Sequence, residues 1–384
     1  MKTVSAQMLK KRIDSIDIMR GIVMLIMLLD HVRERFFFHE QVTDPMTLDS
    51  TSTGLFISRF AAHFCAPTFV FLTGVSAWLY SHPQFGPERS ARSFLIKRGL
   101  FIIALECTVI TFQWMGNYDM IWLQVMWAIG ISMLALALLI GLPRFWLGVI
   151  GLVIVFGHNA LTPISFAPGE WGYTIWAILH DRGNIFTSDF VGIRASYPVL
   201  PWIGVILLGY VIAPIYAASF DDVKRHKILI GLGLVSFALF AILRGFNIYG
   251  ETLDWQQGDS VIMTLKSIFN LTKYPPSLGF LLVTIGGTLL CLSMLEKVKP
   301  QYGKVLSTFG SAPMFFYIVH LYLLLFMYRF AVNVIGPNYG ELYGFTHIGW
   351  VWVVTIVLAV LLYYPTKRFS QYKHQSKQVW IKYL

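Results

Sequence analysis

The sequence predicts an all-α, polytopic membrane protein of about ten transmembrane helices, with the N- and C-termini both in the cytoplasm. Of the 384 residues, 56% are hydrophobic and only 13% are charged. Because soluble domains carry roughly 25% charged residues, this composition is typical of an integral membrane protein. Apolar stretches of about 20 residues, long enough to cross a bilayer as a helix, occupy most of the chain and leave no room for a sizeable soluble domain.

Ten apolar stretches are the predicted spans, and they follow one another along the whole chain. They are residues 15–38, 56–80, 94–114, 119–140, 144–163, 197–217, 227–245, 277–296, 309–332 and 347–365. They predict a single transmembrane domain over residues 1–384, which consists of a cytoplasmic tail (1–14), a helical bundle (15–365) and a second cytoplasmic tail (366–384).

Lysine and arginine are distributed unevenly between the two sides of the predicted bundle. With these spans, 20 of the 30 Lys and Arg residues fall on the side of the termini and eight on the opposite side, while Arg20 and Arg59 lie inside spans. Cytoplasmic loops carry the excess of positive charge, so both termini are predicted to be cytoplasmic. The net charge of +10 is therefore a signal of topology, and we expect no nucleic-acid partner.

The long loops all fall on the outer side in this topology, at residues 39–55, 157–196, 246–276 and 333–346. In the second of them, the segment WGYTIWAILHDRG predicts a short helix at the membrane interface, anchored by its aromatic residues. Because binding residues concentrate on loops that a rigid scaffold holds, we expect a polar substrate to meet the protein from outside.

The first span is rich in charged and titratable residues, although it enters the bilayer. Such charges cost about 2.5–3.5 kcal/mol each at membrane depth, so the cluster indicates a functional site. Arg20 and His31 are eleven positions apart, which on a helix places both on one face, about 16 Å apart along the axis. His31, the adjacent Asp30 and His39 at the membrane exit are the candidate catalytic residues, because imidazole suits proton transfer near neutral pH.

The charged residues of this span also have a structural explanation. Asp30 can pair with Arg33, three positions later, in an ion network that includes Glu34 and caps the bundle. Arg20 can pair in the same way with Asp17. The functional alternative for Arg20 is a contact to the phosphate or pantetheine part of a ligand that enters from the cytoplasm.

Three further candidates lie outside the first span. Arg59 and His63 share one face of the second span at positions i and i+4, and Lys273 precedes a Tyr-Pro-Pro segment at the entry to the eighth span. With Arg20 they are the candidate cofactor-binding residues, although His63 is as readily structural and Lys273 as readily an interfacial anchor. Weaker polar points are His158, His180 and His320. No metal-binding spacing, Walker loop or GxSxG motif occurs, so no metal site is predicted.

Several segments carry a resemblance to a known family. SIDIMRGIVMLIMLLDH resembles the first span of the transmembrane acyltransferase superfamily, whose signature of Arg, ten residues and His is filled here by Arg20 and His31. DHVRERFFFHE and HFCAPTFVFLTGVSAWLY resemble more narrowly the bacterial relatives of heparan-α-glucosaminide N-acetyltransferase. Also similar to that group are YPVLPWIGVILLGY (197–210), KYPPSLGFLLVTIG (273–286) and SAPMFFYIVHLYLL (311–324).

The resemblance implies an acetyltransferase that moves an acetyl group from cytoplasmic acetyl-CoA to a sugar amine or hydroxyl on the outer face of the inner membrane. His39 is the nearest match to the family's active histidine, whereas His31 fills the superfamily signature, so both stay candidates. The histidine acts either as general base or as a covalent acetyl carrier. The implied partners are a glycan or amino-sugar acceptor and membrane lipid, and a homodimer is compatible with the sequence.

A secondary transporter or permease for a small sugar-like solute is the alternative function. Intramembrane charge and many aromatic residues are also found in that class. The alternative predicts solute flux that does not depend on CoA. The sequence contains no internal repeat of useful strength, which disfavours it, because many transporters are built from duplicated halves.

Overall fold

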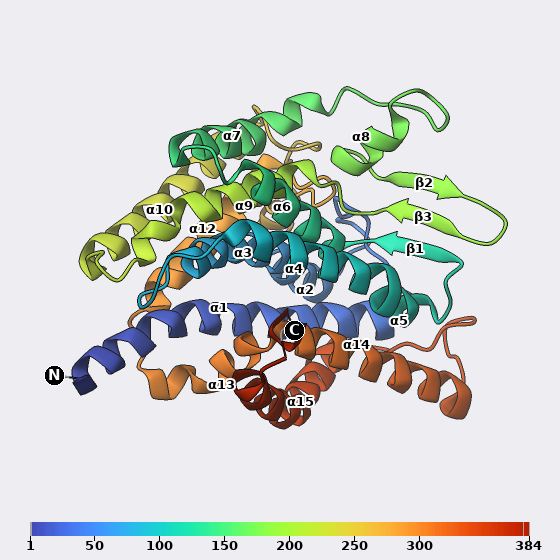
Figure 1. The fold of residues 1–384 in the computed structure, drawn as a ribbon. Coiled ribbons are helices and arrows are strands. Elements are labelled where there is room, and N and C mark those ends of the chain that lie inside the picture. The colour runs from blue at the N-terminus through green and yellow to red at the C-terminus, as the bar shows by residue number, and fades with distance from the viewer. Residues whose placement is uncertain (1, 379, 384) are drawn as a thin grey trace. The chain divides into compact units, whose positions relative to one another are not determined.

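The structure is a computed structural model that describes residues 2–378 and 380–383 (Figure 1). Helices make up 67% of the chain and strands 5%, so the helical class predicted from the sequence is confirmed, with a small sheet added. Contacts within the chain divide it into two compact units. The first unit is Met1–Cys65 with Cys291–Leu384, and the second unit is Ala66–Leu290. The single domain proposed from the sequence stays a prediction.

The first unit is built around one long helix. α1 (Lys2–Phe36) runs without a break through most of the predicted tail and the first predicted span, so Arg20 and His31 do lie on one helix. The other helices of this unit are α2 (Thr53–Ala62), α13 (Pro300–Ser311), α14 (Pro313–Phe330) with a π-helical turn at Ala331–Ile335, and α15 (Gly349–Gln375), followed by a 3-10 turn at Trp380–Tyr383. α1 packs against α13, α14, α15 and α2.

Two glycines let α1 and α13 approach each other closely. A Cβ atom on Gly21 would lie 1.9 Å from the carbonyl oxygen of Leu306, and a Cβ atom on Gly310 would lie 1.8 Å from that of Asp17. Since real Cβ atoms do not come so near to a backbone oxygen, the two helices pack backbone against backbone here. Small residues at such contacts are typical of helix association in membranes.

Replacing Gly21 with alanine is expected to push α1 away from α13 and to lower the free energy of unfolding by about 1–3 kcal/mol, the usual cost of overpacking. Thermal unfolding of the purified protein in detergent measures this loss. Gly231→Ala on α10 (Asp222–Gly245) is the matched control, because no atom lies within 4 Å of its added Cβ. Alanine favours a helix over glycine by up to about 1 kcal/mol, so the control should be neutral or stabilising. An equal loss in both variants would contradict the close contact.

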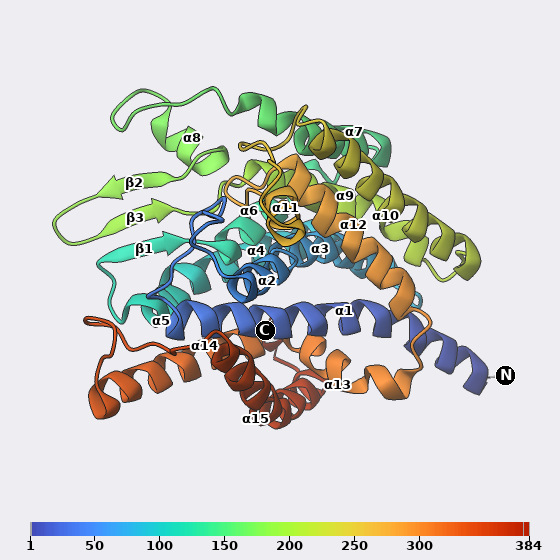
Figure 2. The same cartoon turned by 180° about the vertical axis from the view of Figure 1, so that it is seen from behind.

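The second unit holds the remaining helices and the sheet (Figure 2). Its helices are α3 (Cys65–Ser81), α4 (Ala91–Leu105), α5 (Thr111–Met115), α6 (Val125–Leu139), α7 (Arg144–Gly157), α8 (Tyr173–Leu179), α9 (Leu200–Ile212), α10, α11 (Val261–Ile268) and α12 (Leu278–Leu295), the last of which runs past the end of the unit. The strands β1 (Met120–Leu123), β2 (Gly183–Thr187) and β3 (Gly192–Ala195) form a sheet in the order β1-β3-β2. β3 is parallel to β1 and antiparallel to β2.

Six helices of the described residues are long and apolar enough to cross a membrane. They are Thr53–Ser81, Arg144–Leu161, Asp222–Gly245, Leu278–Leu295, Pro313–Ile335 and Gly349–Gln375. The first of these ranges combines α2 and α3. Each overlaps one of the spans expected from the sequence, and together they indicate a multi-pass membrane protein. The total of ten spans and the cytoplasmic position of both termini stay predictions.

The remaining predicted spans fall on helices that are charged, short or interrupted. α6 and α9 are apolar but short, and α4 passes at Glu106 into a π-helical turn that ends at Ile110. The predicted start of the fourth span at residue 119 is wrong, because Met120–Leu123 pairs with β3 as a strand. The sequence pattern of a short apolar run does not distinguish a helix from a strand, so the presence of a pairing strand determines which of the two forms. The short helix expected in the second outer loop is confirmed as α8.

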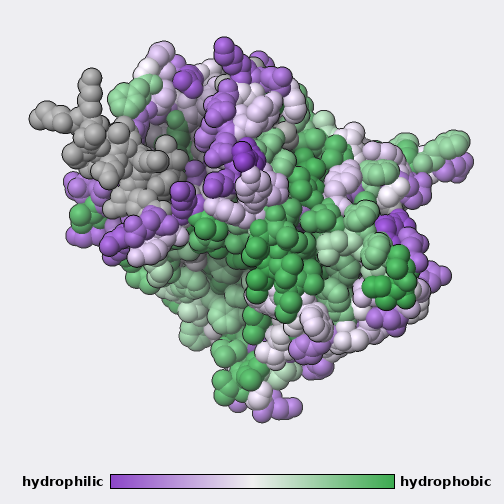
Figure 3. Space-filling view, turned by 90° about the horizontal axis from the view of Figure 1, so that it is seen from below, coloured by the Kyte–Doolittle hydropathy of each residue, from purple (hydrophilic) through white to green (hydrophobic). Residues whose placement is uncertain are grey.

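The outward face of α15 is apolar along most of its length. Its exposed side chains include Trp352, Val353, Ile356, Val357, Val360 and Leu361. Figure 3 shows hydrophobic residues gathered into a broad area on the face that it displays. Apolar areas of this kind are rare on soluble monomers and are expected where a helix borders lipid.

Candidate active site

Two buried histidines face each other in the first unit. His31 lies near the C-terminal end of α1 and His320 lies on α14, and Nδ1 of His31 is 2.7 Å from Nε2 of His320. The rings are stacked with their centroids 5.1 Å apart, and Tyr317 contacts His31 edge to face. The exposed fraction is 8% for His31 and 0% for His320. The pair therefore forms a packed centre, largely shielded from solvent, where α1 meets α14.

The hydrogen bonds of this pair determine which ring nitrogen carries each proton. Nδ1 of His320 lies 2.6 Å from the carbonyl oxygen of Phe316, which can only accept, so this nitrogen is protonated. In a neutral His320 the lone pair is then on Nε2, which accepts a hydrogen bond from Nδ1–H of His31. A neutral His31 consequently carries its own lone pair on Nε2. Because Nδ1 is engaged by His320, Nε2 is the nitrogen of His31 that can accept a proton as a general base, and His320 holds the ring in this tautomer.

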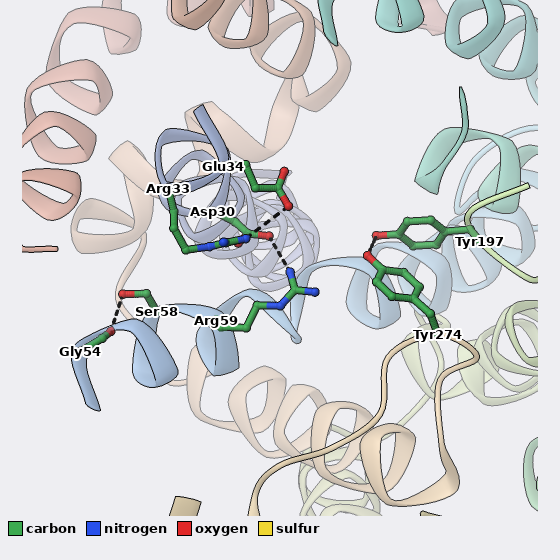
Figure 4. A network of polar contacts seen from close by, with 8 residues as sticks. All are labelled: Asp30, Arg33, Glu34, Gly54, Ser58, Arg59, Tyr197 and Tyr274. Carbon is green, nitrogen blue, oxygen red and sulfur yellow. Dashed lines mark hydrogen bonds and ion pairs between the residues drawn. The ribbon is translucent and has the colours of Figure 1, made fainter. Parts of the chain in front are cut away.

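Asp30, the residue before His31, is held by two arginines. Its Oδ1 accepts hydrogen bonds from Nε and Nη2 of Arg33 at 2.9 and 2.8 Å. Its Oδ2 lies 3.6 Å from Nη1 of Arg59 on α2, and Glu34 lies 3.3 Å from Arg33. Figure 4 shows Arg33 and Arg59 reaching the same carboxylate from α1 and α2. The ion network that the spacing suggested is thus present, and a catalytic role for Asp30 stays a prediction.

His39 lies in the turn that follows α1 and packs against the loop before α15. Its ring is stacked on that of Tyr339, with centroids 3.7 Å apart, and it also contacts Phe37. Its Nδ1 is buried and has no hydrogen-bond partner among the described residues. A Cβ atom on Gly344 would lie only 2.4 Å from this nitrogen. His39 therefore has one ring nitrogen that makes no hydrogen bond among the described residues, but the loop around it leaves little space for a substrate.

The other candidates of the first unit occupy α1 and the end of α2. Arg20 forms an ion pair of 2.9 Å with Asp17, which is the structural pairing expected from their spacing, and its side chain is 23% exposed. His63 is buried and directly follows α2, where its ring lies 6.0 Å from that of Phe60. A role of Arg20, Arg59 and His63 in binding a cofactor stays a prediction.

Lys273, the remaining candidate, lies in the second unit just before α12. Its Nζ is 5.2 Å from the ring centre of Tyr274 and 5.9 Å from that of Tyr197. The two tyrosine hydroxyls are hydrogen-bonded at 2.9 Å, as Figure 4 shows. Arg182 lies over the ring of Tyr274 at 5.0 Å. Two cations and two tyrosines thus form a compact cluster, and all four residues belong to the second unit.

The structure brings together residues that are distant in the sequence. Within the first unit, Arg59 of α2 reaches Asp30 of α1, and His320 of α14 reaches the neighbouring His31. The sequence marked His320 only as a weak polar point, because 289 positions separate it from His31. The available signal was a histidine inside an apolar helix, a rare and often functional feature of membrane proteins. Among the described residues, no group of three His, Cys, Asp or Glu side chains is arranged to hold a metal ion.

A further carboxylate, Glu251, fastens the loop before α12 in the second unit. It accepts hydrogen bonds from the hydroxyl of Ser277 and from the backbone N–H of Thr272. Burial raises the pKa of Glu251 to about 7, although these hydrogen bonds and the charge of Arg244 lower it. In the unfolded chain the pKa of Glu251 is 4.5, so between pH 4.5 and about pH 7 the carboxylate takes up a proton when the protein folds. Its contribution to stability is therefore greatest below pH 4.5 and is lost as the pH rises to about 7.

The variant Glu251→Gln is expected to remove this pH dependence, since glutamine keeps an acceptor oxygen and carries no charge. Between about pH 5 and about pH 8, the wild-type protein should lose up to about 3 kcal/mol more unfolding free energy than the variant, at 1.36 kcal/mol per pKa unit. Thermal unfolding of both proteins at the two pH values measures the difference. Parallel losses in the two proteins would show that Glu251 is not the titrating group.

A sequence model of one protein family, described as heparan-alpha-glucosaminide N-acetyltransferase, catalytic, matches residues 12–243, which is more than half of the chain. The matched range includes α1 from residue 12 onward and all of α2, and hence the candidates from Arg20 to His63. It ends before Lys273 and His320. A comparison with curated proteins gave no match.

Proposed function

The chain belongs to the heparan-alpha-glucosaminide N-acetyltransferase catalytic family, and from this we propose that it acetylates a sugar amine or hydroxyl on the outer face of the membrane with cytoplasmic acetyl-CoA. Family membership supports membrane acetyl transfer in general, whereas the donor, the direction and the acceptor are our proposal. The observation that carries it is the His31–His320 hydrogen bond, because it favours the His31 tautomer that can remove a proton.

His31 is the proposed general base of the reaction. Its Nε2 takes a proton from the acceptor as the acceptor's nitrogen or oxygen bonds to the acetyl carbon. The carbon–sulfur bond of the thioester then breaks, and the proton passes from His31 to the departing CoA thiolate. A positioned base typically contributes about 10²–10⁴-fold to the rate, and holding donor and acceptor together contributes further through proximity. Transfer through a covalent acetyl-histidine is the alternative route.

His320 is the proposed positioning residue for His31. His320→Ala is expected to lower kcat by about 10–100-fold with little change in KM, by analogy with groups that orient a metal-bound histidine. His320→Gln should recover part of kcat, because its amide oxygen can accept the same hydrogen bond from His31. Steady-state kinetics of the wild-type protein and of both variants give the kcat and KM values that test this role. Equal losses of kcat and of thermal stability in both variants would indicate a structural role alone.

Arg20, Arg59 and His63, all in the first unit, are the proposed contacts for acetyl-CoA, and the cofactor-binding role expected of Lys273 in the second unit stays a separate prediction. Arg20 is the best suited of them, because guanidinium binds phosphate well and this side chain is partly exposed. Arg59 also balances the charge of Asp30.

The proposal includes the topology that brings the two substrates to opposite ends of α1. We place ten spans in the inner membrane, with both termini in the cytoplasm, on the strength of the Lys and Arg distribution. A glycan or amino sugar is the proposed acceptor. A homodimer stays a prediction.

Two measurements with labelled acetyl-CoA test the proposal. Purified protein in detergent should transfer label to glucosamine, and it should be stabilised against heat by acetyl-CoA in a manner that Arg20→Ala abolishes. In a single turnover without acceptor, label retained on the protein would favour the covalent route. If neither transfer nor stabilisation is seen, and proteoliposomes take up sugar without CoA, the protein is a transporter instead.

A further inference from the structure

α11, in the loop that joins α10 to α12, presents its apolar face outward. The exposed fraction is 77% for Val261, 56% for Ile262 and 49% for Leu265. On the opposite face, it is 5% for Lys266 and 9% for Ser267. A helix in contact with water buries its apolar stripe and exposes its polar one. The burial pattern of α11 is the reverse.

Specific hydrogen bonds fix α11 in this orientation. Arg244 donates from Nε to the carbonyl of Ile268 at 3.1 Å and from Nη2 to that of Ser267 at 2.9 Å. The hydroxyl of Ser267 accepts from the backbone N–H of Gln256 at 2.9 Å, and that of Thr264 accepts from Gly258 at 3.1 Å. Turning the helix to bury its apolar face would break the contacts of Ser267 and Thr264. The outward apolar face is therefore part of the fold.

The apolar face of α11 is accompanied by exposed apolar residues on and after α10. α10 is one of the membrane-crossing candidates, and Leu234, Val235 and Ile242 are exposed along it. Phe246 and Ile248, directly beyond its end, are exposed as well. Arg244, in the last turn of α10, is the residue that holds the C-terminal end of α11. The exposed apolar surface of α10, a candidate membrane span, thus continues beyond the end of that helix, and Arg244 ties α11 to it.

A polar turn precedes α11 in the same loop. Its exposed residues are Asp254, Gln256, Gln257, Asp259 and Ser260. The hydroxyl of Ser260 caps α11 by accepting a hydrogen bond from the N–H of Met263 at 3.2 Å. Polar residues at the start of a helix whose exposed side is apolar are typical of a segment that enters the membrane surface from water.

We propose that α11 lies in the plane of the bilayer interface, with Val261, Ile262 and Leu265 inserted among the lipid acyl chains. The occupant of this face is lipid hydrocarbon, and the polar turn before it reaches the aqueous phase. Figure 2 shows α11 nearly end-on in this loop. The loop at residues 246–276, which the sequence places on the outer side, is thereby anchored in lipid at its centre. This inference does not depend on the acetyltransferase activity.

Spin labelling of the full-length protein in lipid nanodiscs tests the proposal. In a background with Cys65, Cys107 and Cys291 replaced by alanine, single cysteines at 261, 262 and 265 are labelled with a nitroxide. Labels at 257 and 259, in the same loop, are the matched controls. Collisions with O2, which is enriched in lipid, should exceed those with the water-soluble NiEDDA at the first three positions. The order should reverse at the two control positions.

Two outcomes would overturn the proposal. Labels at 261, 262 and 265 that collide mainly with NiEDDA would place α11 in water. Labels that neither reagent reaches would indicate a protein partner, such as a second copy of this chain, in place of lipid. Thermal unfolding of every labelled protein shows whether it has folded, and three positions on one exposed face keep the test decisive if one substitution fails. The assay uses no acyl donor, so its result is separate from that of the transfer assay.

Discussion

Replacing His31 with alanine is expected to lower the rate of acetyl transfer by about 10²–10⁴-fold, the usual contribution of a general base. The reason is the tautomer that His320 enforces, which leaves the proton-accepting lone pair on Nε2 of His31. Labelled acetyl-CoA and glucosamine, with wild-type and variant protein in the same detergent, measure the effect. Retained stabilisation of the variant by acetyl-CoA would show that the loss concerns chemistry and not binding of the donor.

Two other histidine variants make this experiment decisive. His374→Ala, at an exposed position near the end of α15, is the matched control and should keep full activity. His39→Ala should lower the rate much less than His31→Ala, because the ring of His39 is packed between Tyr339 and Gly344. If His39→Ala abolishes transfer while His31→Ala leaves it intact, the base is His39 and the proposed role of the His31–His320 pair is wrong.

Replacing Asp30 with alanine is expected to lower the free energy of unfolding by about 3–5 kcal/mol, the cost of leaving buried charges without their partner. Arg33 and Arg59, both buried, share the carboxylate of Asp30, so two guanidinium groups lose a counter-charge at once. Chemical or thermal unfolding of the detergent-solubilised protein measures the loss. Activity should fall as well, because His31 is the next residue on the same helix.

The control for Asp30 is an ion pair of the same spacing in which the arginine, Arg225, is buried but the carboxylate is exposed. Asp222 and Arg225 are also three positions apart and 2.7 Å from each other, but the side chain of Asp222 is 80% exposed. Water screens an exposed carboxylate, and such pairs contribute about 0–1 kcal/mol, so Asp222→Ala should lower stability less than Asp30→Ala. Similar losses of unfolding free energy in Asp30→Ala and Asp222→Ala would mean that the burial of the Asp30 carboxylate does not increase its contribution to stability.

Much of the fold could be predicted from the sequence because the signals are local. The length and apolarity of six spans are recovered, as is the short helix α8. The spacing of Asp17 with Arg20, and of Asp30 with Arg33, predicted both ion pairs, since residues three apart on a helix are neighbours. The strand at Met120–Leu123 was missed, because its pairing partner lies about 70 residues away at Gly192–Ala195.

The candidate site was predictable only in part. The sequence placed Arg20 and His31 on one helix and marked Arg59 as a charged residue inside a span. It gave no reason to join His320 to His31, or Arg59 to Asp30, because no periodicity relates positions on different helices. The consequence for chemistry is large, since His320 decides which nitrogen of His31 can accept a proton.

By itself, the sequence determined that this chain enters a membrane, where six of its apolar helices lie and which residues share a face of α1, because hydropathy and helical period are properties of neighbouring residues. Only the tertiary structure decided that Asp30 is shared by two arginines, that His31 is paired with His320 and that α11 turns its apolar face outward. These features depend on packing between distant segments, where the geometry of side chains from separate helices, and not their order in the chain, sets each contact.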